Sequence, residues 1–182
     1  MKKIIIMALM AATTLAFAAC GDDDEQTPSE AAARTAIIDG VTYQLEQNVQ
    51  YDPNGMYYVD AHEAVTGDTE PRFSLRADAK FSSLNQTFDL TQAVAGEGFA
   101  FGIHRDDYYV QADCHEGEVY GFEGDVEYES ASPFQSGTLK VTRNDAGDLE
   151  YFLNGVTKAG HTISVHVYAP YDEIEILNWD IR

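Results

Sequence analysis

The chain is poor in the residues on which several common functions depend. Of its 182 residues only 11 are Lys or Arg, against 31 Asp or Glu, and the formal charge is −20. A protein that binds nucleic acid through bulk electrostatics needs a basic face, so this composition excludes that class. The single tryptophan, Trp179, leaves little material for the exposed indole platforms on which sugar binding usually relies. The sequence also lacks the patterns C-x-x-C, H-E-x-x-H and G-x-S-x-G, which mark zinc sites and nucleophile elbows.

Long hydrophobic runs are missing as well. The mostly apolar stretch from Ile4 to Phe17 is shorter than the about 20 residues that a transmembrane helix needs. It follows the cationic pair Lys2-Lys3 and precedes small residues, which is the layout of a secretory signal. We therefore expect residues 1–19 to be a signal peptide.

The end of this signal carries a family resemblance. Residues 17–20, Phe-Ala-Ala-Cys, resemble the lipobox of bacterial lipoproteins, in which the cysteine is acylated and becomes the first mature residue. The next residues resemble the acidic surface-export tag of Bacteroidales-type lipoproteins, formed here by Asp22, Asp23, Asp24 and Glu25. The resemblance implies lipidation at Cys20 and a lipid-anchored location in the outer membrane, facing the cell exterior.

Residues 20–34 are expected to be the lipid anchor and an acidic flexible linker. This stretch has no large apolar residue, and it contains Pro28 and a run of acids. Without residues 1–19 the chain has 9 basic and 31 acidic residues, a formal charge of −22. An anionic membrane surface repels such a body, so attachment depends on the acyl chains.

From Thr35 onward the pattern has period two, which predicts one antiparallel β domain over residues 35–182. Asp39-Gly40 lies between β-forming residues and predicts a type I′ hairpin turn. Residues 52–55, Asp-Pro-Asn-Gly, predict a further turn, and strands are expected over 57–65 and 73–81.

Two segments allow a prediction of strand register. If Asp106-Asp107 is a two-residue turn, the apolar face consists of the opposed pairs Ile103–Val110, Phe101–Ala112 and Phe99–Cys114. This register makes Cys114 a buried and inert thiol. With Cys20 acylated, a disulfide within the mature chain is also excluded.

The second segment runs from Gly137 to Tyr168 and predicts a three-stranded meander. A loop over 144–148 places Val141 opposite Tyr151, and a turn near Lys158 then places Val165 opposite Tyr151 and Ile163 opposite Leu153. Gly137–Val141 and Gly160–Val165 resemble the C-terminal region of small uncharacterised Bacteroidales lipoproteins, a family that implies no activity. A bulge near 176–177 would keep the apolar residues of the last strand on one face.

About ten strands and no strong helix predict an all-β fold. The architecture is either an antiparallel β-sandwich or an up-and-down, lipocalin-like β-barrel, and periodicity does not choose between them.

Candidate chemistry is sparse. Calcium could bind oxygen-rich turns, for which the sequence offers Asp106, Asp107, Asn144, Asp145 and Asp148. A plain hairpin turn also explains the oxygen-rich group formed by Asn144, Asp145 and Asp148. His104 with Asp106 or Asp107 could suggest a general base oriented by a carboxylate, but no motif marks a nucleophile, and a surface histidine in a solvated loop is the favoured interpretation. We expect neither a metal nor a cofactor.

Three functions remain open. The favoured one is a non-catalytic binding module whose partner is an extracellular glycan or protein, without nucleic acid. A lipocalin-like binder of a small apolar ligand is the first alternative. A hydrolase with an unmarked carboxylate site is the second, because acid–base pairs leave no spacing pattern.

Overall fold

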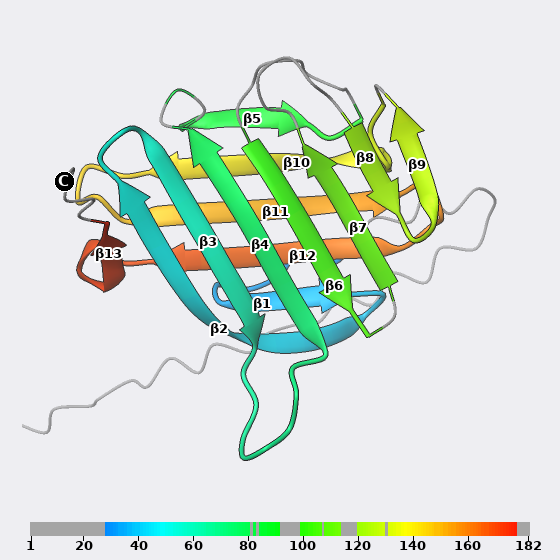
Figure 1. The fold of residues 1–182 in the computed structure, drawn as a ribbon, viewed down its shortest axis with the longest axis horizontal. Helices are drawn as coiled ribbons and strands as arrows, with labels where there is room; N and C mark the ends of the chain where they lie inside the picture. Colours follow the sequence, from blue (N-terminus) through cyan, green and yellow to red (C-terminus); the bar gives the residue numbers. More distant parts are fainter. Residues whose placement is uncertain are drawn as a thin grey trace, which may run out of the picture.

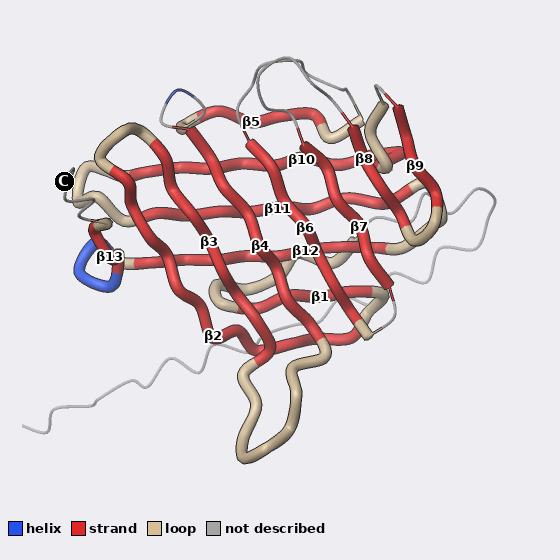
Figure 2. Tube along the Cα trace, viewed as in Figure 1, coloured by secondary structure: helices blue, strands red, loops and turns tan. Residues whose placement is uncertain are grey.

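The computed structural model describes residues 28–80, 82, 84–91, 99–106, 108–113, 120–129 and 131–177. Figure 1 shows that these residues form a curled β-sheet, and Figure 2 shows how little of it is helical. The 13 strands belong to one sheet, and a short 3₁₀ turn at Tyr171–Glu173 precedes the last of them. In this described part, no helix has the length and apolar character required to cross a membrane.

Strands that are close in the sequence are mostly neighbours in the sheet, and they pair antiparallel. Their bounds are β1 Thr35–Ile38, β2 Val41–Asp52, β3 Met56–Glu63, β4 Phe73–Lys80, β5 Gln86–Asp89, β6 Phe99–Arg105, β7 Tyr108–Asp113, β8 Tyr120–Glu123, β9 Val126–Glu129, β10 Phe134–Arg143, β11 Leu149–Thr157, β12 Thr162–Ala169 and β13 Ile174–Ile176. The predicted all-β fold is confirmed, and the described residues form 13 strands where about ten were expected, because several strands have only three or four residues.

The sheet folds over itself at β2. The first residues of this long strand pair with β1, and residues 45–52 pair with β3. The strand order is β5-β10-β11-β12-β1-β2-β3-β4-β6-β7-β8-β9, and β13 pairs with β2 in parallel. We call β2 to β9 without β5 the front half, and β5, β10, β11, β12 and β1 the back half. In Figure 1 the front strands cross the back strands at a steep angle.

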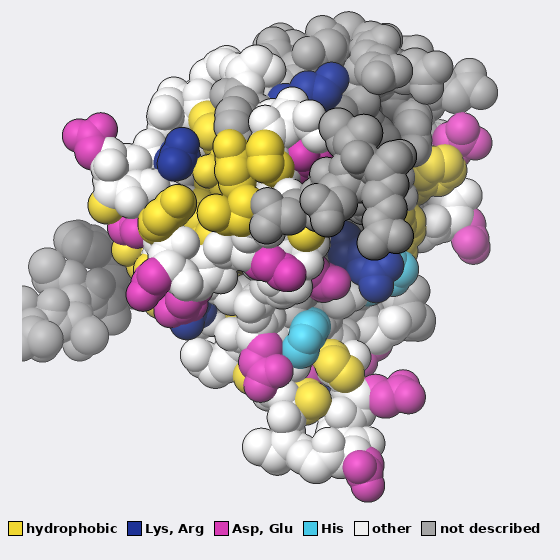
Figure 3. Space-filling view, turned by 60° about the vertical axis from the view of Figure 1, so that its left-hand side comes forward, with side chains coloured by type: hydrophobic (Ala, Val, Ile, Leu, Met, Phe, Trp, Pro, Cys, Tyr) yellow, Lys and Arg dark blue, Asp and Glu magenta, His cyan; other side chains and the backbone are white. Residues whose placement is uncertain are grey.

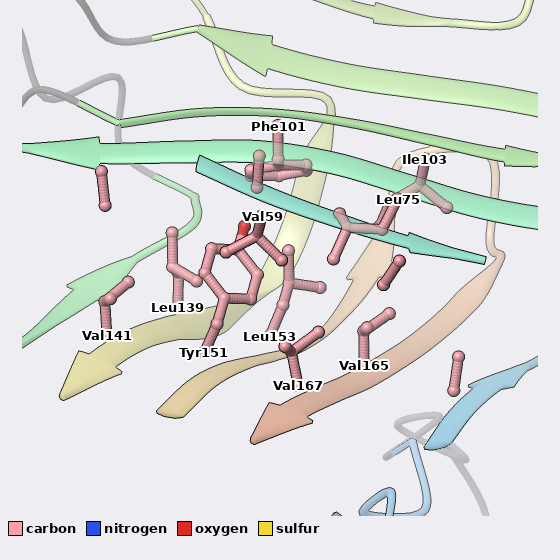
Figure 4. Packing of buried hydrophobic residues seen from close by; sticks show 14 of the residues in the cluster. Val59, Leu75, Phe101, Ile103, Leu139, Val141, Tyr151, Leu153, Val165 and Val167 are labelled. Carbon is pink, nitrogen blue, oxygen red and sulfur yellow. The ribbon is translucent and has the colours of Figure 1, made fainter. Parts of the chain in front are cut away.

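The core lies between the two halves. Alternate side chains of each strand point inward, so Leu75 and Ile103 from the front face Leu153 and Val165 from the back (Figure 4). Aromatic contacts also bridge the halves, with the rings of Phe101 and Phe134 5.9 Å apart. The interior of the curled sheet is therefore occupied by side chains (Figure 4).

Most of the predicted turns and pairs are confirmed. Asp39 and Gly40 have φ angles of 49° and 77°, the two positive values that a type I′ turn requires. Val110 lies opposite Ile103, and Ala112 lies opposite Phe101, as the apolar pattern predicted. The predicted partner of Phe99, Cys114, lies outside the described residues.

The predicted pairing of β11 with β12 was wrong by two residues. Leu153 lies opposite Val165, and Tyr151 lies opposite Val167. The turn extends further than expected, because Thr157 N–H bonds to His161 O at 2.9 Å and Gly160 takes a positive φ of 92°. A shift of two residues leaves the same side chains facing the core, which is why periodicity could not detect it.

The end of the expected linker is part of the folded body. Ala31 is buried, and its N–H donates to Ser164 Oγ at 2.9 Å. Arg34 N–H bonds to His166 O at 2.7 Å. The expectation of a flexible linker up to residue 34 is corrected here: residues 31–34 lie against the outer face of β12. The predicted bulge at 176–177 falls at the end of the described chain, since β13 ends at Ile176.

Candidate functional site

A hollow of about 1090 Å³ lies on the outer face of the front half. It crosses β2, β3, β4, β6 and β7, whose inward side chains fill the core and whose outward side chains are mostly polar. We call it the outer hollow. Its outward-facing lining consists of Asn48, Gln50, Tyr58, Asp60, His62, Ser74, Arg76, Asp78, Ala100, Gly102, His104, Tyr109 and Gln111.

An ordered pair of rings forms one side of the outer hollow. The ring of Tyr109 lies over Gly102, where a Cβ would be 3.5 Å from it, at ordinary van der Waals contact. The ring centroids of Tyr109 and His104 are 4.3 Å apart, and the Tyr109 hydroxyl donates to the Gln111 side chain. Burial raises the pKa of Tyr109, so the hydroxyl remains protonated at neutral pH.

The charged groups of the outer hollow are few. Arg76 Nε lies 3.9 Å from Asp60 Oδ2, and the side chains of this pair are 86% and 54% exposed. Water screens such a pair, so both groups can exchange their mutual contact for a ligand at little cost. Asp78 accepts a hydrogen bond of 3.0 Å from the N–H of Ala100 on the neighbouring strand. Across the hollow, Tyr58 is 38% exposed.

A second polar cluster closes one end of the sheet. Asp39 Oδ2 accepts from Arg105 Nη1 at 2.6 Å and lies 2.9 Å from His161 Nδ1. Burial acts to raise the pKa of Asp39, but the contacts with His161 and the N–H of Thr162 outweigh it, so this pKa is lowered. These contacts tie the β1–β2 turn to β6 and to the β11–β12 turn.

A buried carboxylate extends this cluster. Glu123 is 4% exposed, accepts from the Tyr108 hydroxyl at 2.9 Å and accepts from the N–H of Ala159 at 3.1 Å. Burial and the nearby Glu123 carboxylate raise the pKa of Tyr108 far above its ordinary value. The Tyr108 ring in turn packs on His161, with centroids 4.1 Å apart. The cluster fastens the β8–β9 edge to the back half.

The candidate calcium loop is a hydrogen-bonded turn. Asp148 Oδ2 accepts from the Asn144 amide at 2.8 Å and from the Tyr168 hydroxyl at 3.1 Å, and Oδ1 accepts from Tyr171 N–H at 3.0 Å. These donors lower the pKa of Asp148 and occupy the oxygens that a cation would need. Asp145 is exposed at the tip of this turn.

The other predicted site residues do not come together. Asp106 Oδ2 lies 3.8 Å from Arg105 Nε, whereas His104 packs on Tyr109. Asp107 lies outside the described residues, as do Cys20, Asp22, Asp23, Asp24 and Glu25. Within the described ranges, no group of three or more His, Cys, Asp or Glu side chains is placed to hold a metal ion.

Carboxyl groups with a shifted pKa bear on the hydrolase alternative. The pKa is lowered for Asp39, Glu63 and Asp148, in each case with hydrogen bonds to the carboxylate as the lowering cause. A general acid in glycoside hydrolysis needs a pKa shifted in the opposite direction. These three groups are therefore unsuited to that role.

The alternation of apolar and polar residues separated the two faces of the strands, but the sequence analysis missed the outer hollow. A usable signal was present, because Ser74, Ala100 and Gly102 are small residues at outward positions of adjacent strands. Small side chains there lower the floor between the larger groups of β2, β3 and β7. Comparisons with models of protein families, with curated proteins and with solved structures found no match.

Proposed function

We propose that this chain is a lipid-tethered, non-catalytic binding module of the outer cell surface, and that the outer hollow is its binding site. The observation that carries the proposal is the hollow itself, about 1090 Å³ in size and lined by polar side chains of five adjacent strands. Ligand sites in proteins are concave and combine a few oriented polar groups with aromatic surface.

The core argues for the outer face over the interior as the binding site. A barrel that holds a small apolar ligand keeps an internal cavity, whereas here Phe101, Phe134 and Tyr151 contribute to a continuous core between the halves. The favoured site is therefore outside the curled sheet.

The position of the tether is compatible with this function. Residues 31–34 lie against the outer face of β12, which belongs to the back half. The outer hollow lies on the front half, on the opposite side of the sheet's fold. The described chain therefore joins the folded body at the back half, on the side opposite the hollow.

Binding without turnover is tested on the mature chain from residue 20, kept free of lipid by Cys20→Ala. The chain is screened by surface plasmon resonance against polysaccharides and extracellular matrix proteins, and soluble products are measured in parallel. Saturable binding without products supports the module. Cleavage that disappears when one Asp or Glu is replaced would overturn it in favour of a hydrolase, and absence of binding across the screen would overturn it as well.

Tethering and exposure are tested in cells. Mass spectrometry of the mature N-terminus should find acylated Cys20 as its first residue, and an unmodified cysteine would contradict the anchor. Replacement of Asp22, Asp23, Asp24 and Glu25 by Ala should leave lipidation intact but protect the protein from protease added to whole cells. Equal digestion of the variant and the natural chain would contradict the role of the acidic cluster.

A further inference from the structure

We propose that the ligand of the outer hollow is a neutral polysaccharide, lying across the strands of the front half. This inference rests on the proposed function and names the chemical class of its ligand. It follows from the size of the hollow, its position in the middle of the sheet, its charge and the chemistry of its side chains.

The size of the hollow favours an extended ligand, and its position argues against a peptide bound as an added strand. At about 1090 Å³ the hollow is at the upper end of small-molecule sites, which suits an extended ligand. An extended peptide usually binds by adding a strand to a free sheet edge. Here β3, β4, β6 and β7 each pair with a neighbour on both sides, so their backbone groups are already used.

An amphipathic helix is also a poor fit. Helix-in-groove binding needs apolar pockets for its anchors. Val59, Ala77 and Phe101 belong to the core and are at most 8% exposed, so they form no open pocket for a helix anchor. Ala100, the outward-facing apolar strand residue of the floor, is too small to form such a pocket.

Charge excludes acidic ligands. Among the residues that line the hollow, Arg76 is the one Lys or Arg. The lining also contains Asp60, which is paired with Arg76, and Asp78. The mature chain from residue 20 has a formal charge of −22, and acidic side chains dominate the charged surface seen in Figure 3. This field repels uronic-acid, sulfated and phosphorylated polymers at a distance. A neutral polymer approaches without that penalty.

The side chains suit hydroxyl groups and sugar rings. Asn48 offers an amide donor and an amide acceptor, and Asp60 adds acceptors, while a sugar hydroxyl can play both roles. Gln50 and Gln111 also line the hollow, where the Gln50 amide donates to Glu175 and the Gln111 side chain accepts from the Tyr109 hydroxyl. Tyr58 and Tyr109 provide aromatic faces for the C–H side of a sugar. Because Tyr109 is already held by Gly102, His104 and Gln111, little rotamer freedom is lost on binding.

The test uses affinity electrophoresis of the mature Cys20→Ala chain in native gels. The acidic protein migrates towards the anode, and an embedded neutral polysaccharide does not move, so retardation reports binding. The probes are dextran, a soluble β-glucan, yeast mannan, galactomannan and arabinoxylan, with alginate and polygalacturonate as acidic counterparts. Tyr58→Ala is the hollow variant. Tyr171→Ala is its matched control, because Tyr171 is also an exposed tyrosine, 49% accessible, and does not line the hollow.

We expect at least one neutral probe to retard the chain, the acidic probes to have no effect, and Tyr58→Ala to weaken binding by about tenfold, a loss of about 1.4 kcal/mol. Tyr171→Ala should bind like the parent chain. Equal thermal unfolding of both variants shows that each is folded.

Each of the other possible results contradicts one part of the proposal. No retardation by any neutral probe overturns the ligand class. If an acidic polymer or a protein then binds in a Tyr58-dependent way, the proposed function stands and only this inference fails. Equal retardation of both variants by a neutral probe overturns the assignment to the outer hollow. Cleavage of a bound neutral probe overturns the non-catalytic function but keeps the ligand class.

Discussion

Asp39 and His161, 122 residues apart in the sequence, meet at one end of the sheet, where Asp39 Oδ2 lies 2.9 Å from His161 Nδ1. The same carboxylate accepts from Arg105 at 2.6 Å and from the N–H of Thr162 at 2.9 Å. One side chain in a two-residue turn therefore connects the β1–β2 turn with β6 of the front half and with the β11–β12 turn of the back half.

Replacement of Asp39 should destabilise the fold according to how many of its hydrogen bonds the new side chain can still accept. Asp39→Ala removes every acceptor and places Ala at a φ of 49°, so we expect a decrease of about 2–4 kcal/mol in the free energy of unfolding. Asp39→Asn keeps one acceptor and tolerates this backbone, and should cost about 1 kcal/mol. Urea unfolding gives both values. An equal cost for the two variants would mean that these hydrogen bonds contribute little.

Acid should remove the stability that the Asp39 carboxylate contributes to the fold. The pKa of Asp39 is lower in the folded chain than its ordinary value of 3.8, so the folded state holds the carboxylate more strongly than the unfolded state does. The resulting stability is complete above pH 3.8 and is lost as the pH falls through the lowered native pKa. The difference in unfolding free energy between the natural chain and Asp39→Asn should therefore shrink on acidification below this value. A difference that stays constant from pH 6 to pH 2 would contradict the shift.

Glu123 should be far more sensitive to replacement than its neighbour Glu127. Glu123→Ala leaves the Tyr108 hydroxyl and the N–H of Ala159 without their acceptor, and should cost about 3 kcal/mol. Glu127 is exposed on β9, so Glu127→Ala should change stability by less than about 0.5 kcal/mol. Thermal or urea unfolding of the pair measures the contrast, and similar losses would argue against a buried role for Glu123.

Removal of one hydroxyl group should have opposite effects at two tyrosines. The Tyr151 hydroxyl is buried without a hydrogen-bond partner among the described residues, so Tyr151→Phe should be neutral or stabilising by up to about 1 kcal/mol. The Tyr108 hydroxyl donates to Glu123, so Tyr108→Phe should destabilise by about 1–2 kcal/mol. A clear destabilisation by Tyr151→Phe would reveal a partner for its hydroxyl.

Local sequence patterns determined much of the fold. Alternation of apolar and polar residues identified which side chains face the core, because side-chain direction in a strand has period two. The Asp39-Gly40 turn and the pairing of Ile103 with Val110 followed from turn chemistry and parity alone. The same parity could not locate the β11–β12 register, since a shift of two residues buries the same set.

Only the tertiary structure decided which segments that are distant in the sequence come into contact. The bend of β2, which brings Leu75 of the front half against Leu153 of the back half, depends on how the sheet twists and closes over its core. The contact of Ala31 with Ser164 likewise joins segments 133 residues apart. The outer hollow arises because small residues on β4 and β6 lie between larger polar residues of β2, β3 and β7. A strand pattern records which face a residue takes, but neighbours across a sheet are set only when non-local strands pair.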